Sequence, residues 1–570
     1  MKFGLSRYTL DVFFDKVIQE YGPRPALASV GEEPFTYHEF ARRVQALKAA
    51  MAEWGIRKED KVVLLGNSSP QWAVAYMAIM TSGAVAVPIL EEFPENDIDH
   101  ILTHSEAKAA FISESLFQSL NLPVLERVSL VINLNDFSLF ARTGKSKAGL
   151  WNQLHNLPEK VLKTRSKGQG PAKAAIQEED LAEILYTSGT TGHSKGVMLT
   201  HKNLVSNLFE GPDLLKVIDR NSVILSILPM AHAFGSTSGF LSIIYCGSCI
   251  YYFNKPPSPK VLLSALQQVR PTILGAVPLV FEKIYHKQVM PIIAKSVFLR
   301  LLSKTAATKR LLYKIVGKKV YQALGGRLRC VIIGGASFSP EVETFLKQGG
   351  IPYCCGYGLS ECSPLVTFSS MREQKMGSPG HAITDTQIKI QDPDPATGIG
   401  EIWIRGPQVM KGYYKNKEAT ARALTADGWF ISGDRGYLDQ DGFLFITGRS
   451  KNVIIGSSGE NIYPEVIEAK LAEHPFVEEA LVYMLDHQLV ARIYPNYGYI
   501  ETLHQNQDET AIAEDISTIL ESVRRQVNGQ LPAFSKINRV LEQSSPFIKT
   551  PTNKIKRAEY VPGYADKPSE

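Results

Sequence analysis

Residues 186–201 read YTSGTTGHSKGVMLTH, and this is the most informative stretch of the sequence. It follows a short apolar run that ends at Leu185-Tyr186, and a helix with a Thr cap can begin at Thr200-His201. Glycines allow backbone N–H groups to approach an anion, hydroxyls add donors, and Lys195 adds a positive charge. The stretch is therefore predicted to bind a polyphosphate, although it does not match the G-x-x-x-x-G-K-[ST] pattern of the common nucleotide loop.

The flanking sequence predicts an α/β fold. Residues 61–66 (KVVLLG) and 83–89 (GAVAVPI) are short apolar runs on either side of a segment with helical period, which indicates a βαβ unit. A similar unit begins at Leu328–Gly335 (LRCVIIGG) and continues into a helix at Ser339-Pro340, where Ser can cap and Pro can occupy the first turn. We therefore expect mostly parallel sheets.

Length and composition indicate more than one domain. The chain has 570 residues, with 44% apolar and 21% charged residues, as in globular proteins. After Gly448-Arg449-Ser450-Lys451 the predicted elements become shorter, so we expect a large domain over residues 1–450 and a small α+β domain over residues 451–570. The net charge of +5 is modest for this length, and nothing predicts nucleic-acid binding.

Five further motifs follow the polyphosphate stretch. They are Pro229–Gly235 (PMAHAFG), the small residues Gly334-Gly335-Ala336, Gly356–Glu361 (GYGLSE), Trp429–Leu438 (WFISGDRGYL) with Gly448-Arg449 after it, and Thr550–Arg557 (TPTNKIKR). In order and spacing, the set resembles the motifs of the adenylate-forming superfamily, closest to its long-chain fatty acid–CoA ligases. The resemblance covers about residues 60 to 557. It implies two packed α/β subdomains plus a distorted β-barrel, followed by a small α+β domain.

The resemblance implies a reaction in two steps. A carboxylate attacks the α-phosphorus of ATP to give acyl-AMP and pyrophosphate, and a thiol then attacks the acyl carbon and releases AMP. ATP, Mg²⁺ and coenzyme A are the implied cofactors. The implied nucleotide-binding residues are Thr187, Ser188, Gly189, Thr190, Thr191, Gly192, Lys195, Gly335, Ala336, Gly356, Tyr357, Gly358, Ser360, Asp434 and Arg449.

The resemblance also implies roles for individual side chains. Tyr357 stacks on adenine, Asp434 and Arg449 reach the ribose, and Ser360 keeps the hydroxyl of a commoner Thr. The implied catalytic residues are Lys554, Glu361, which also holds the metal, Thr187 and His232. Lys556 is the alternative to Lys554, because many members have Gly where this chain has Asn553. Lys451 occupies the hinge position, and Gly459 lies in the loop expected to meet the pantetheine arm.

The expected substrate is a medium- or long-chain fatty acid, with coenzyme A as acceptor. His232 is expected to border the acyl pocket, near Phe240, Val277 and Leu365, and no Asp is placed to bind an amino acid's ammonium group. An acidic acyl carrier protein is an alternative acceptor. A catalytically silent nucleotide- or lipid-binding homologue is another hypothesis, and a luciferase-like monooxygenase is a third.

An apolar segment and the cysteines bear on where in the cell the protein is found. Ser222 to Asn254 lacks Asp, Glu, Lys and Arg and is long enough to span a bilayer, but its Pro, His, Gly and Ser favour a buried helix plus a central strand. Cys246 and Cys249 within it are interpreted as buried apolar residues rather than metal or redox ligands. The six cysteines show no framework of pairs, and no secretory signal is expected, so a cytoplasmic location is predicted.

Residues 295–329 form a basic stretch with apolar residues at helical spacing, among them Leu311, Leu312, Ile315, Val316 and Val320. It is interpreted either as a solvated face on a packed helix or as a docking surface for anionic lipid, coenzyme phosphates or an acidic carrier protein. Peripheral contact with the inner membrane face follows from the lipid alternative. Residues 142–175, rich in Lys, Gly and Ser, are expected to be a surface linker.

Overall fold

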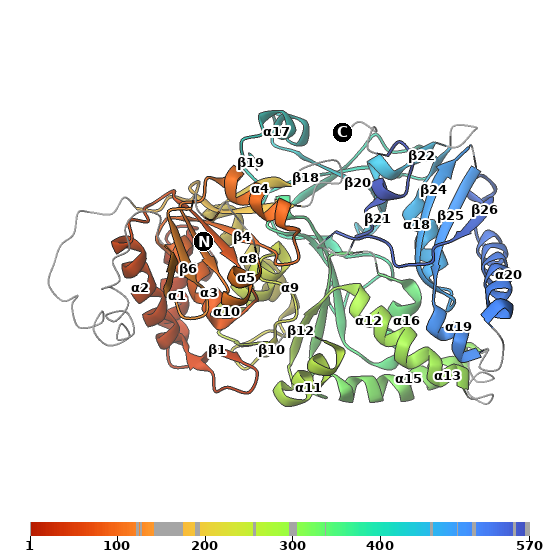
Figure 1. The fold of residues 1–570 in the computed structure, drawn as a ribbon, viewed down its shortest axis with the longest axis horizontal. Helices are drawn as coiled ribbons and strands as arrows, with labels where there is room; N and C mark the ends of the chain where they lie inside the picture. Colours follow the sequence, from red (N-terminus) through yellow and green to blue (C-terminus); the bar gives the residue numbers. More distant parts are fainter. Residues whose placement is uncertain are drawn as a thin grey trace.

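The computed structural model describes residues 2–120, 125, 128–141, 175–187, 194–254, 258–295, 305–336, 338–455, 460–486, 488–503, 509–550 and 554–564. Figure 1 shows a large α/β body and a smaller unit, in blue, built from the C-terminal part of the chain. This arrangement confirms the predicted fold class of a large N-terminal domain followed by a small α+β domain. The expected linker lies almost entirely outside the described residues.

The first large sheet has eight strands and contains the predicted βαβ unit. Strands β3 and β4 pair in parallel, and α3 (Pro70–Thr81) connects them. The Ser69 hydroxyl accepts a hydrogen bond from the Trp72 N–H at 3.0 Å, and Pro70 occupies the first turn. In spatial order the strands are β19 (Gly412–Tyr413), β9 (Lys195–Thr200), β8 (Leu181–Thr187), β4 (Val85–Ile89), β3 (Lys61–Leu65), β5 (Ala109–Ile112), β6 (Leu130–Asn133) and β7 (Leu139–Ala141).

Helices pack around this sheet and bury it on both faces, as expected for parallel strands. Nearly every residue of α3 is buried. The other helices of this part are α1 (Leu10–Tyr21), α2 (Tyr37–Glu53), α4 (Glu95–Ser105), α5 (Glu114–Ser119), α8 (His201–Leu208) and α9 (Glu210–Leu215). Thr200 caps α8 as predicted, since its side chain accepts from the Asn203 N–H.

The second large sheet has nine strands. Its order is β16 (His381–Ala382), β15 (Leu365–Phe368), β14 (Tyr353–Gly358), β13 (Cys330–Ile333), β12 (Ile273–Ala276), β10 (Val223–Leu225), β11 (Cys249–Tyr252), β1 (Pro25–Ser29) and β2 (Phe35–Thr36). Successive side chains of a strand face opposite sides. Val331 and Ile333 accordingly pack with the helices on one face, whereas Cys330 and Ile332 pack into the core on the other.

The two faces of this sheet carry different segments. One face is covered by α11 (Pro259–Val269), α12 (Pro278–Ile284), α15 (Ala306–Ala323) and α16 (Pro340–Gly349), and η4 (Tyr285–Val289) and α13 (Met290–Lys295) follow α12. The core on the other face includes the π-helix η3 (Phe234–Leu241) and α10 (Ser242–Tyr245). Ser339 precedes α16 as predicted, but its side chain makes no cap hydrogen bond.

The segment from Ser222 to Asn254 forms β10, η3, α10 and β11 inside the large domain, which confirms the buried interpretation. Cys246 and Cys249 are buried and free, and all six cysteines are free. In the described part of the chain, no helix is long and apolar enough to cross a membrane.

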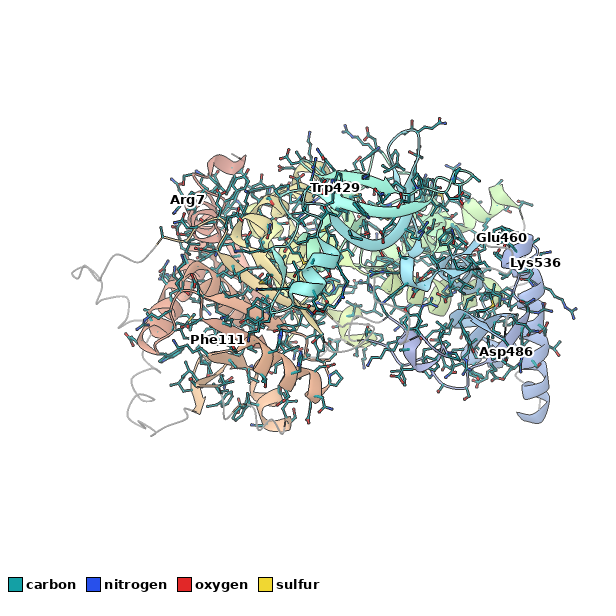
Figure 2. The ribbon with its side chains drawn as sticks, turned by 90° about the horizontal axis from the view of Figure 1, so that it is seen from above. Arg7, Phe111, Trp429, Glu460, Asp486 and Lys536 are labelled. Carbon is teal, nitrogen blue, oxygen red and sulfur yellow. The ribbon has the colours of Figure 1, made fainter. Side chains whose placement is uncertain are left out.

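A four-stranded antiparallel sheet stands where the distorted barrel was expected, and the described residues form no closed barrel. Its order is β17 (Gln387–Gln391), β18 (Gly400–Arg405), β20 (Phe430–Leu438) and β21 (Leu444–Arg449), with α17 (Lys417–Ala423) nearby. Seen from above in Figure 2, Trp429 beside this sheet lies between Phe111 of the eight-stranded sheet and Asp486 and Lys536 of the small domain.

The small domain begins after β21 and the short turn η6 (Ser450–Asn452). The hairpin β22 (Ile454–Ile455) and β23 (Asn461–Ile462) is followed by a three-stranded sheet of β24 (Val477–Leu485), β25 (Gln488–Pro495) and β26 (Arg539–Glu542). Helices α18 (Pro464–Ala472), α19 (Tyr497–Leu503) and α20 (Glu509–Asn528) complete it. It has a hydrophobic core of its own, formed by residues from Ile454 to Ile537.

Candidate active site

Tyr357, Asp434 and Arg449 form a closed network at one end of the candidate site. The Tyr357 hydroxyl donates to Asp434 Oδ2 at 2.6 Å, and Arg449 Nε lies 2.7 Å from Asp434 Oδ1. Asp434 and Arg449 are register partners on β20 and β21, so the antiparallel ladder itself places the two side chains together. The Asp434 side chain is only 6% exposed.

Burial and charge fix the protonation of this network. Burial, followed by the Asp434 carboxylate, raises the pKa of Tyr357 well above its usual value, so its hydroxyl remains a donor. Asp434 also raises the pKa of Arg449, which keeps the guanidinium charged. The arrangement can therefore present a fixed carboxylate and a fixed cation to the hydroxyls of a sugar.

Two glycine-rich segments lie beside this network, at the ends of β13 and β14. Gly335 has a φ of +91° and is exposed together with Ala336, so this backbone is accessible to a ligand. A Cβ on Gly358 would lie 2.1 Å from the Pro364 carbonyl oxygen, and only glycine fits there. Ser360 follows in the short turn η5 (Ser360–Cys362).

A second group lies where η5, β9 and β19 meet. The Tyr413 hydroxyl donates to Glu361 Oε1 at 3.0 Å, and Lys195 Nζ lies 5.2 Å from the centre of the Tyr413 ring. Strand β19 pairs with β9, with Tyr413 opposite Val197, and the Met410 N–H donates to the Glu361 carbonyl at 2.8 Å. The segment around β19 therefore holds the carboxylate and the lysine together.

Tyr413 is a functional candidate that the sequence did not reveal. Burial and Glu361 raise its pKa, so the hydroxyl donates to the carboxylate throughout the neutral range. The neighbouring Tyr414 faces the other way, with its ring 5.7 Å from that of His104. Strand β19 ends at Tyr413 and the chain turns at Tyr414, and only the contacts in the structure show which tyrosine reaches Glu361.

The polyphosphate stretch is a β-hairpin. Thr187 at the end of β8 is the register partner of Lys195 at the start of β9. Ser188, Gly189, Thr190, Thr191 and Gly192 lie outside the described residues. Lys195, at the start of β9, brings this stretch to the Glu361 group because its ammonium group lies near the Tyr413 ring.

Lys554 of the small domain lies within electrostatic range of both groups. Desolvation, followed by Arg449, lowers its pKa, whereas Asp434 and Glu361 raise it. The residue as a whole is exposed, but its ammonium group lies among protein atoms, which is why desolvation is the main cause of the lowered pKa. Lys556 is two residues further along, where its N–H donates to the Ile548 carbonyl of the same domain.

Lys451 lies at the junction of the two domains. Burial, followed by the charges of Arg449, Lys195 and Lys554, lowers its pKa to about 8. Its ammonium group is 5.9 Å from the centre of the Tyr564 ring. Lys451 thus lies among Arg449, Lys195, Lys554 and Arg557, and this local positive charge would favour the binding of a polyphosphate.

His232 faces the same region from the large domain. Burial, with a further contribution from Lys554, lowers its pKa to about 4, so the imidazole is neutral at physiological pH. Its Nδ1 accepts from the Phe234 N–H at 3.2 Å. Of the expected acyl-pocket residues, Phe240 is fully buried in the aromatic core with Tyr76 and Phe40.

The other two expected pocket residues contact the glycine segments. A Cβ built on Gly335 would lie 3.6 Å from Val277, and one built on Gly356 would lie 3.2 Å from Leu365. Both side chains are half-buried.

The chain after Lys554 is bound to η6 and α18 by side-chain hydrogen bonds. The Tyr564 hydroxyl donates to Asn452 Oδ1, and the Asn452 amide donates to Glu465 Oε1. The Arg557 guanidinium donates to both oxygens of Glu468 at 2.6 Å. Gly459, predicted to lie near the thiol, is outside the described residues.

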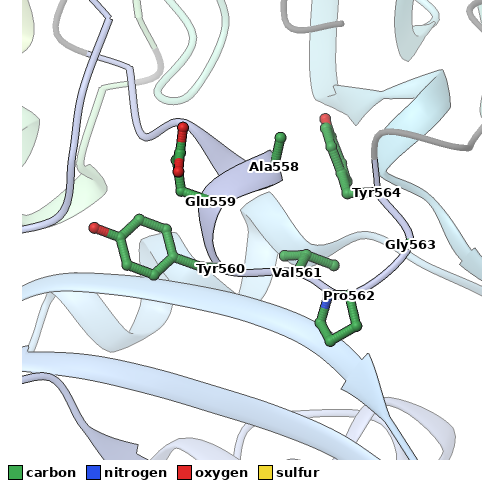
Figure 3. A pocket seen from close by; sticks show the side chains of 7 residues that line it. All are labelled: Ala558, Glu559, Tyr560, Val561, Pro562, Gly563 and Tyr564. Carbon is green, nitrogen blue, oxygen red and sulfur yellow. The ribbon is translucent and has the colours of Figure 1, made fainter.

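The same tail encloses an open pocket of about 290 Å³ lined by residues 558–564 (Figure 3). Tyr560 and Tyr564 project in different directions from it, because Tyr564 reaches Asn452 and the Tyr560 hydroxyl accepts from the Ile548 N–H. None of the predicted site residues lines this pocket.

The donor set around Glu361 fits a hard cation carried by phosphates. One carboxylate oxygen accepts from Tyr413, and Mg²⁺ prefers one or two carboxylates with phosphate oxygens and water as its other ligands. In the described chain, no group of three or more His, Cys, Asp and Glu side chains could hold a metal.

Comparison with known proteins agrees with this geometry. The model of the family described as AMP-binding enzyme matches residues 14–414. The chain belongs to the AMP-binding enzyme family. This confirms the resemblance to adenylate-forming enzymes.

Relatives of this AMP-binding enzyme include two kinds of fatty acid ligase. Long-chain-fatty-acid–CoA ligase FadD15 of Mycobacterium bovis is 32% identical over an alignment of 477 positions, gaps included, that covers 78% of this chain and 74% of that protein. Long-chain-fatty-acid–[acyl-carrier-protein] ligase AEE15, chloroplastic, of Arabidopsis thaliana is 28% identical over an alignment of 639 positions, gaps included, that covers 96% of this chain and 84% of that protein.

Solved structures share the fold over nearly the whole chain. The ATP-bound RpMatB-BxBclM chimera B1 gives a TM-score of 0.75 at 21% identity and covers 98% of this chain and 99% of that one. The anthranilate CoA ligase AuaEII in complex with anthranoyl-AMP gives 0.75 at 19% identity, with coverage of 97% and 96%. At these identities the matches establish the fold alone.

Proposed function

We propose that this AMP-binding enzyme activates a medium- or long-chain fatty acid with ATP and transfers the acyl group to the thiol of coenzyme A. The observation that carries the proposal is the convergence of Lys195, Glu361 and Lys554 beside the Asp434–Arg449 pair. The family match supports the nucleotide chemistry, and the fatty acid ligases among the relatives support the substrate.

In the first step, a carboxylate oxygen of the acid attacks the α-phosphorus of ATP. The bond from that phosphorus to the oxygen bridging to the β-phosphate breaks, and pyrophosphate leaves with the bonding electrons. Both reactants are anions, so the site must supply positive charge and hold them in line. We assign that charge to Lys195 and Lys554, and assign Thr187 and the loop residues after it to the phosphates.

The remaining nucleotide contacts follow the geometry of the site. Asp434 would accept the ribose hydroxyls and Arg449 would hold Asp434 in place. Tyr357 would lie against the adenine, with the backbone of Gly335, Ala336, Gly356 and Gly358 alongside. Glu361 would hold Mg²⁺, which neutralises phosphate charge when bound.

In the second step, the thiol sulfur attacks the acyl carbon, the bond from that carbon to the AMP oxygen breaks, and the thiol proton is released. We propose that the small domain rotates about Lys451 between the steps, so that Lys554 leaves the site and Gly459 lies beside the pantetheine arm. We propose the domain boundary between residues 450 and 451, within the short turn η6 that links the two parts of the chain. His232 would border the bound acyl group as a neutral side chain.

A carrier protein is the second candidate acceptor, because AEE15 is named as a ligase of that kind. Coenzyme A is preferred because FadD15 is named as a CoA ligase and is the more similar over its matched segment. A reducing cytoplasm is proposed as the compartment, consistent with six free cysteines. We also propose peripheral contact with the inner membrane face through the basic region of residues 295–329.

Pyrophosphate release across acids of graded chain length tests the function, with coenzyme A and acyl carrier protein compared as acceptors. The proposal predicts acid-dependent release that rises with chain length, and thioester formation with coenzyme A. A preference for carrier protein would replace the acceptor only. Release that no acid stimulates would contradict the proposed activity and favour a catalytically silent homologue.

A further inference from the structure

His104, near the end of α4, contacts the base of the hairpin that carries the polyphosphate stretch. Its Nδ1 is hydrogen bonded to the Tyr186 hydroxyl at 2.8 Å, and the two rings meet edge to face. Tyr186 directly precedes Thr187, and its register partner on β9 is Gly196, the residue after Lys195. The hydrogen bond from α4 therefore reaches the hairpin beside both residues that are assigned to the phosphates.

The Tyr186 ring lies against the neighbouring strand of the hairpin. A Cβ built on Gly196 would lie 3.2 Å from this ring and 2.9 Å from the Ile184 side chain, so a side chain at Gly196 would displace one of them. Burial, followed by Tyr414, raises the pKa of Tyr186 well above its usual value, so the hydroxyl keeps its proton. The position of this ring thus bears on both strands.

The same end of α4 also holds the chain that follows β19 (Figure 1). Lys415 Nζ donates to the His104 carbonyl at 3.0 Å and forms an ion pair with Glu106 at 2.8 Å. The last carbonyls of a helix have no partner within it, and a lysine ammonium group suits them. The Tyr414 N–H donates to the Gly196 carbonyl at 2.7 Å, so α4, β9 and the end of β19 meet at one place.

We propose that His104 is a positioning residue for the binding of the ATP phosphates. It acts through the Tyr186 hydroxyl, which fixes the end of β8 at Thr187 and the start of β9 at Lys195. Side chains that must meet a ligand in one geometry need a second layer of hydrogen bonds to hold them. The inference rests on the proposed function, which assigns Thr187 and Lys195 to the phosphates.

The charges around His104 suit support by geometry rather than by electrostatic attraction. Burial, followed by His100 and Lys415, lowers the pKa of His104, and only Glu106 opposes them. The imidazole is therefore neutral in the neutral range, with one N–H and one nitrogen lone pair. A neutral ring can form the hydrogen bond to Tyr186 without adding a further cation beside Lys415.

Packing of α4 gives an alternative explanation for the position of His104. The helix buries Ile98, Ile101 and Leu102 in the core of the large domain. These apolar side chains hold the helix whether or not His104 forms its hydrogen bond. A variant that keeps a ring at this position but lacks the nitrogen therefore separates positioning from packing.

Nucleotide binding, measured by calorimetry on the full-length protein without any acid, is the test. His104→Phe keeps a ring against Tyr414 and removes the hydrogen bond to Tyr186, so the affinity for ATP should fall about tenfold. The affinity for AMP should stay unchanged, because AMP lacks the β- and γ-phosphates and its ribose is assigned to Asp434 and Arg449. Tyr186→Phe should give the same pattern.

Two further variants make the test specific to the hydrogen bond. His104→Asn places an amide oxygen or nitrogen near the position of Nδ1 and should restore most of the ATP affinity. The double variant His104→Phe/Tyr186→Phe should lose no more affinity than either single variant, because both changes remove one shared interaction.

His474→Phe is the matched control. His474 is a half-buried imidazole of the small domain that is hydrogen bonded to Gln526 at 3.1 Å and stacks on Phe476. Its replacement removes an equivalent hydrogen bond away from the hairpin. This variant should bind ATP and AMP like the wild type.

Several outcomes would overturn the proposal. One is wild-type ATP affinity in His104→Phe, and another is an equal loss of ATP and AMP affinity, which would show a general disturbance of the large domain. Additive losses in the double variant would show that the two residues act separately. Failure of His104→Asn to restore the affinity would assign the effect to the shape of the imidazole. If the binding pattern holds but no acid stimulates pyrophosphate release, the proposed function fails and the role of His104 stands.

Discussion

The two ends of the candidate site are built in contrasting ways. At the ribose end, Asp434 and Arg449 are partners in one β-ladder, and the buried Tyr357 hydroxyl closes the network. At the other end, Lys554 comes from the small domain, is exposed, and acts on Asp434 and Glu361 through charge. Its backbone exchanges hydrogen bonds with Thr550 of its own domain.

This difference suits a reaction in two steps. The nucleotide must remain bound throughout, so its contacts belong on rigid strands. A lysine needed for the first step alone can be carried by a domain that moves away. At the proposed hinge, Tyr564, Asn452 and Glu465 are joined by side-chain hydrogen bonds.

Replacing Lys554 should have the largest effect. Lys554→Ala removes a cation from the position where two anions meet, and acid-dependent ATP–pyrophosphate exchange should fall about 1000-fold. Radiolabel exchange at saturating ATP and acid measures it. Lys556→Ala is the matched control and should exchange normally. The opposite pattern would move the role to Lys556.

Replacing Asp434 should weaken ATP binding at the ribose end of the site. Asp434→Asn keeps the shape but removes the charged partner of Arg449 and an acceptor for Tyr357, so the KM for ATP should rise about 100-fold. Initial rates over a range of ATP concentrations give the value. Asp427→Asn, at an exposed turn where Asp427 accepts from Thr425, serves as control and should leave the KM unchanged. An unaltered KM in Asp434→Asn would remove this residue from the nucleotide site.

A smaller change is expected at Tyr413. Tyr413→Phe removes the hydrogen bond that orients Glu361, so the Mg²⁺ concentration for half-maximal exchange should rise about tenfold. This concentration is measured by following ATP–pyrophosphate exchange over a range of Mg²⁺ concentrations. ATP binding is measured in parallel with and without the ion. Tyr414→Phe removes the hydroxyl of the neighbouring tyrosine, whose ring contacts His104, and should behave like the wild type. Equal effects in both variants would show a general loss of packing instead.

The smallest effect is expected in the pH dependence of the affinity for ATP, which we assign to Lys451. Its pKa is lowered to about 8 by burial and by nearby cations, and bound triphosphate should raise it again. ATP binding should therefore take up a proton near pH 8, and affinity should fall about fivefold between about pH 7 and about pH 9. Calorimetry in buffers of different ionisation enthalpy measures the uptake. Lys451→Met should abolish this pH dependence, and a wild-type affinity that rises with pH would contradict the assignment.

Local sequence predicted the parts of the site that depend on neighbouring residues. The Thr200 cap, the βαβ unit of residues 61–89 and the buried interpretation of residues 222–254 are all properties of short segments. The Asp434–Arg449 pair was also within reach, because the two motifs are separated by one hairpin turn. Hydrophobic period and turn chemistry are sufficient for such features.

Pairings across long stretches of sequence could not be predicted in the same way. Tyr413 and Glu361 are 52 residues apart, and Tyr564 and Asn452 are 112 apart. The amino-acid sequence of either segment does not specify the distant residue with which it forms a hydrogen bond. Leu311 and Ile315 of α15, which are 57% and 55% exposed, show a related limit, since helical spacing places them on one stripe but does not say whether another element covers it.

One measurement most directly tests the contrast between the ribose end, built on strands β20 and β21, and the end to which the small domain brings Lys554. It is single-turnover thioester formation from synthetic acyl-AMP and coenzyme A, compared in Lys554→Ala and Asp434→Asn. The account predicts that Lys554→Ala forms thioester at nearly the wild-type rate, because the lysine has left the site. Asp434→Asn should form thioester slowly at low acyl-AMP concentration, because the second step still needs Asp434 to bind the ribose of acyl-AMP. Equal loss of thioester formation in both variants would contradict the account.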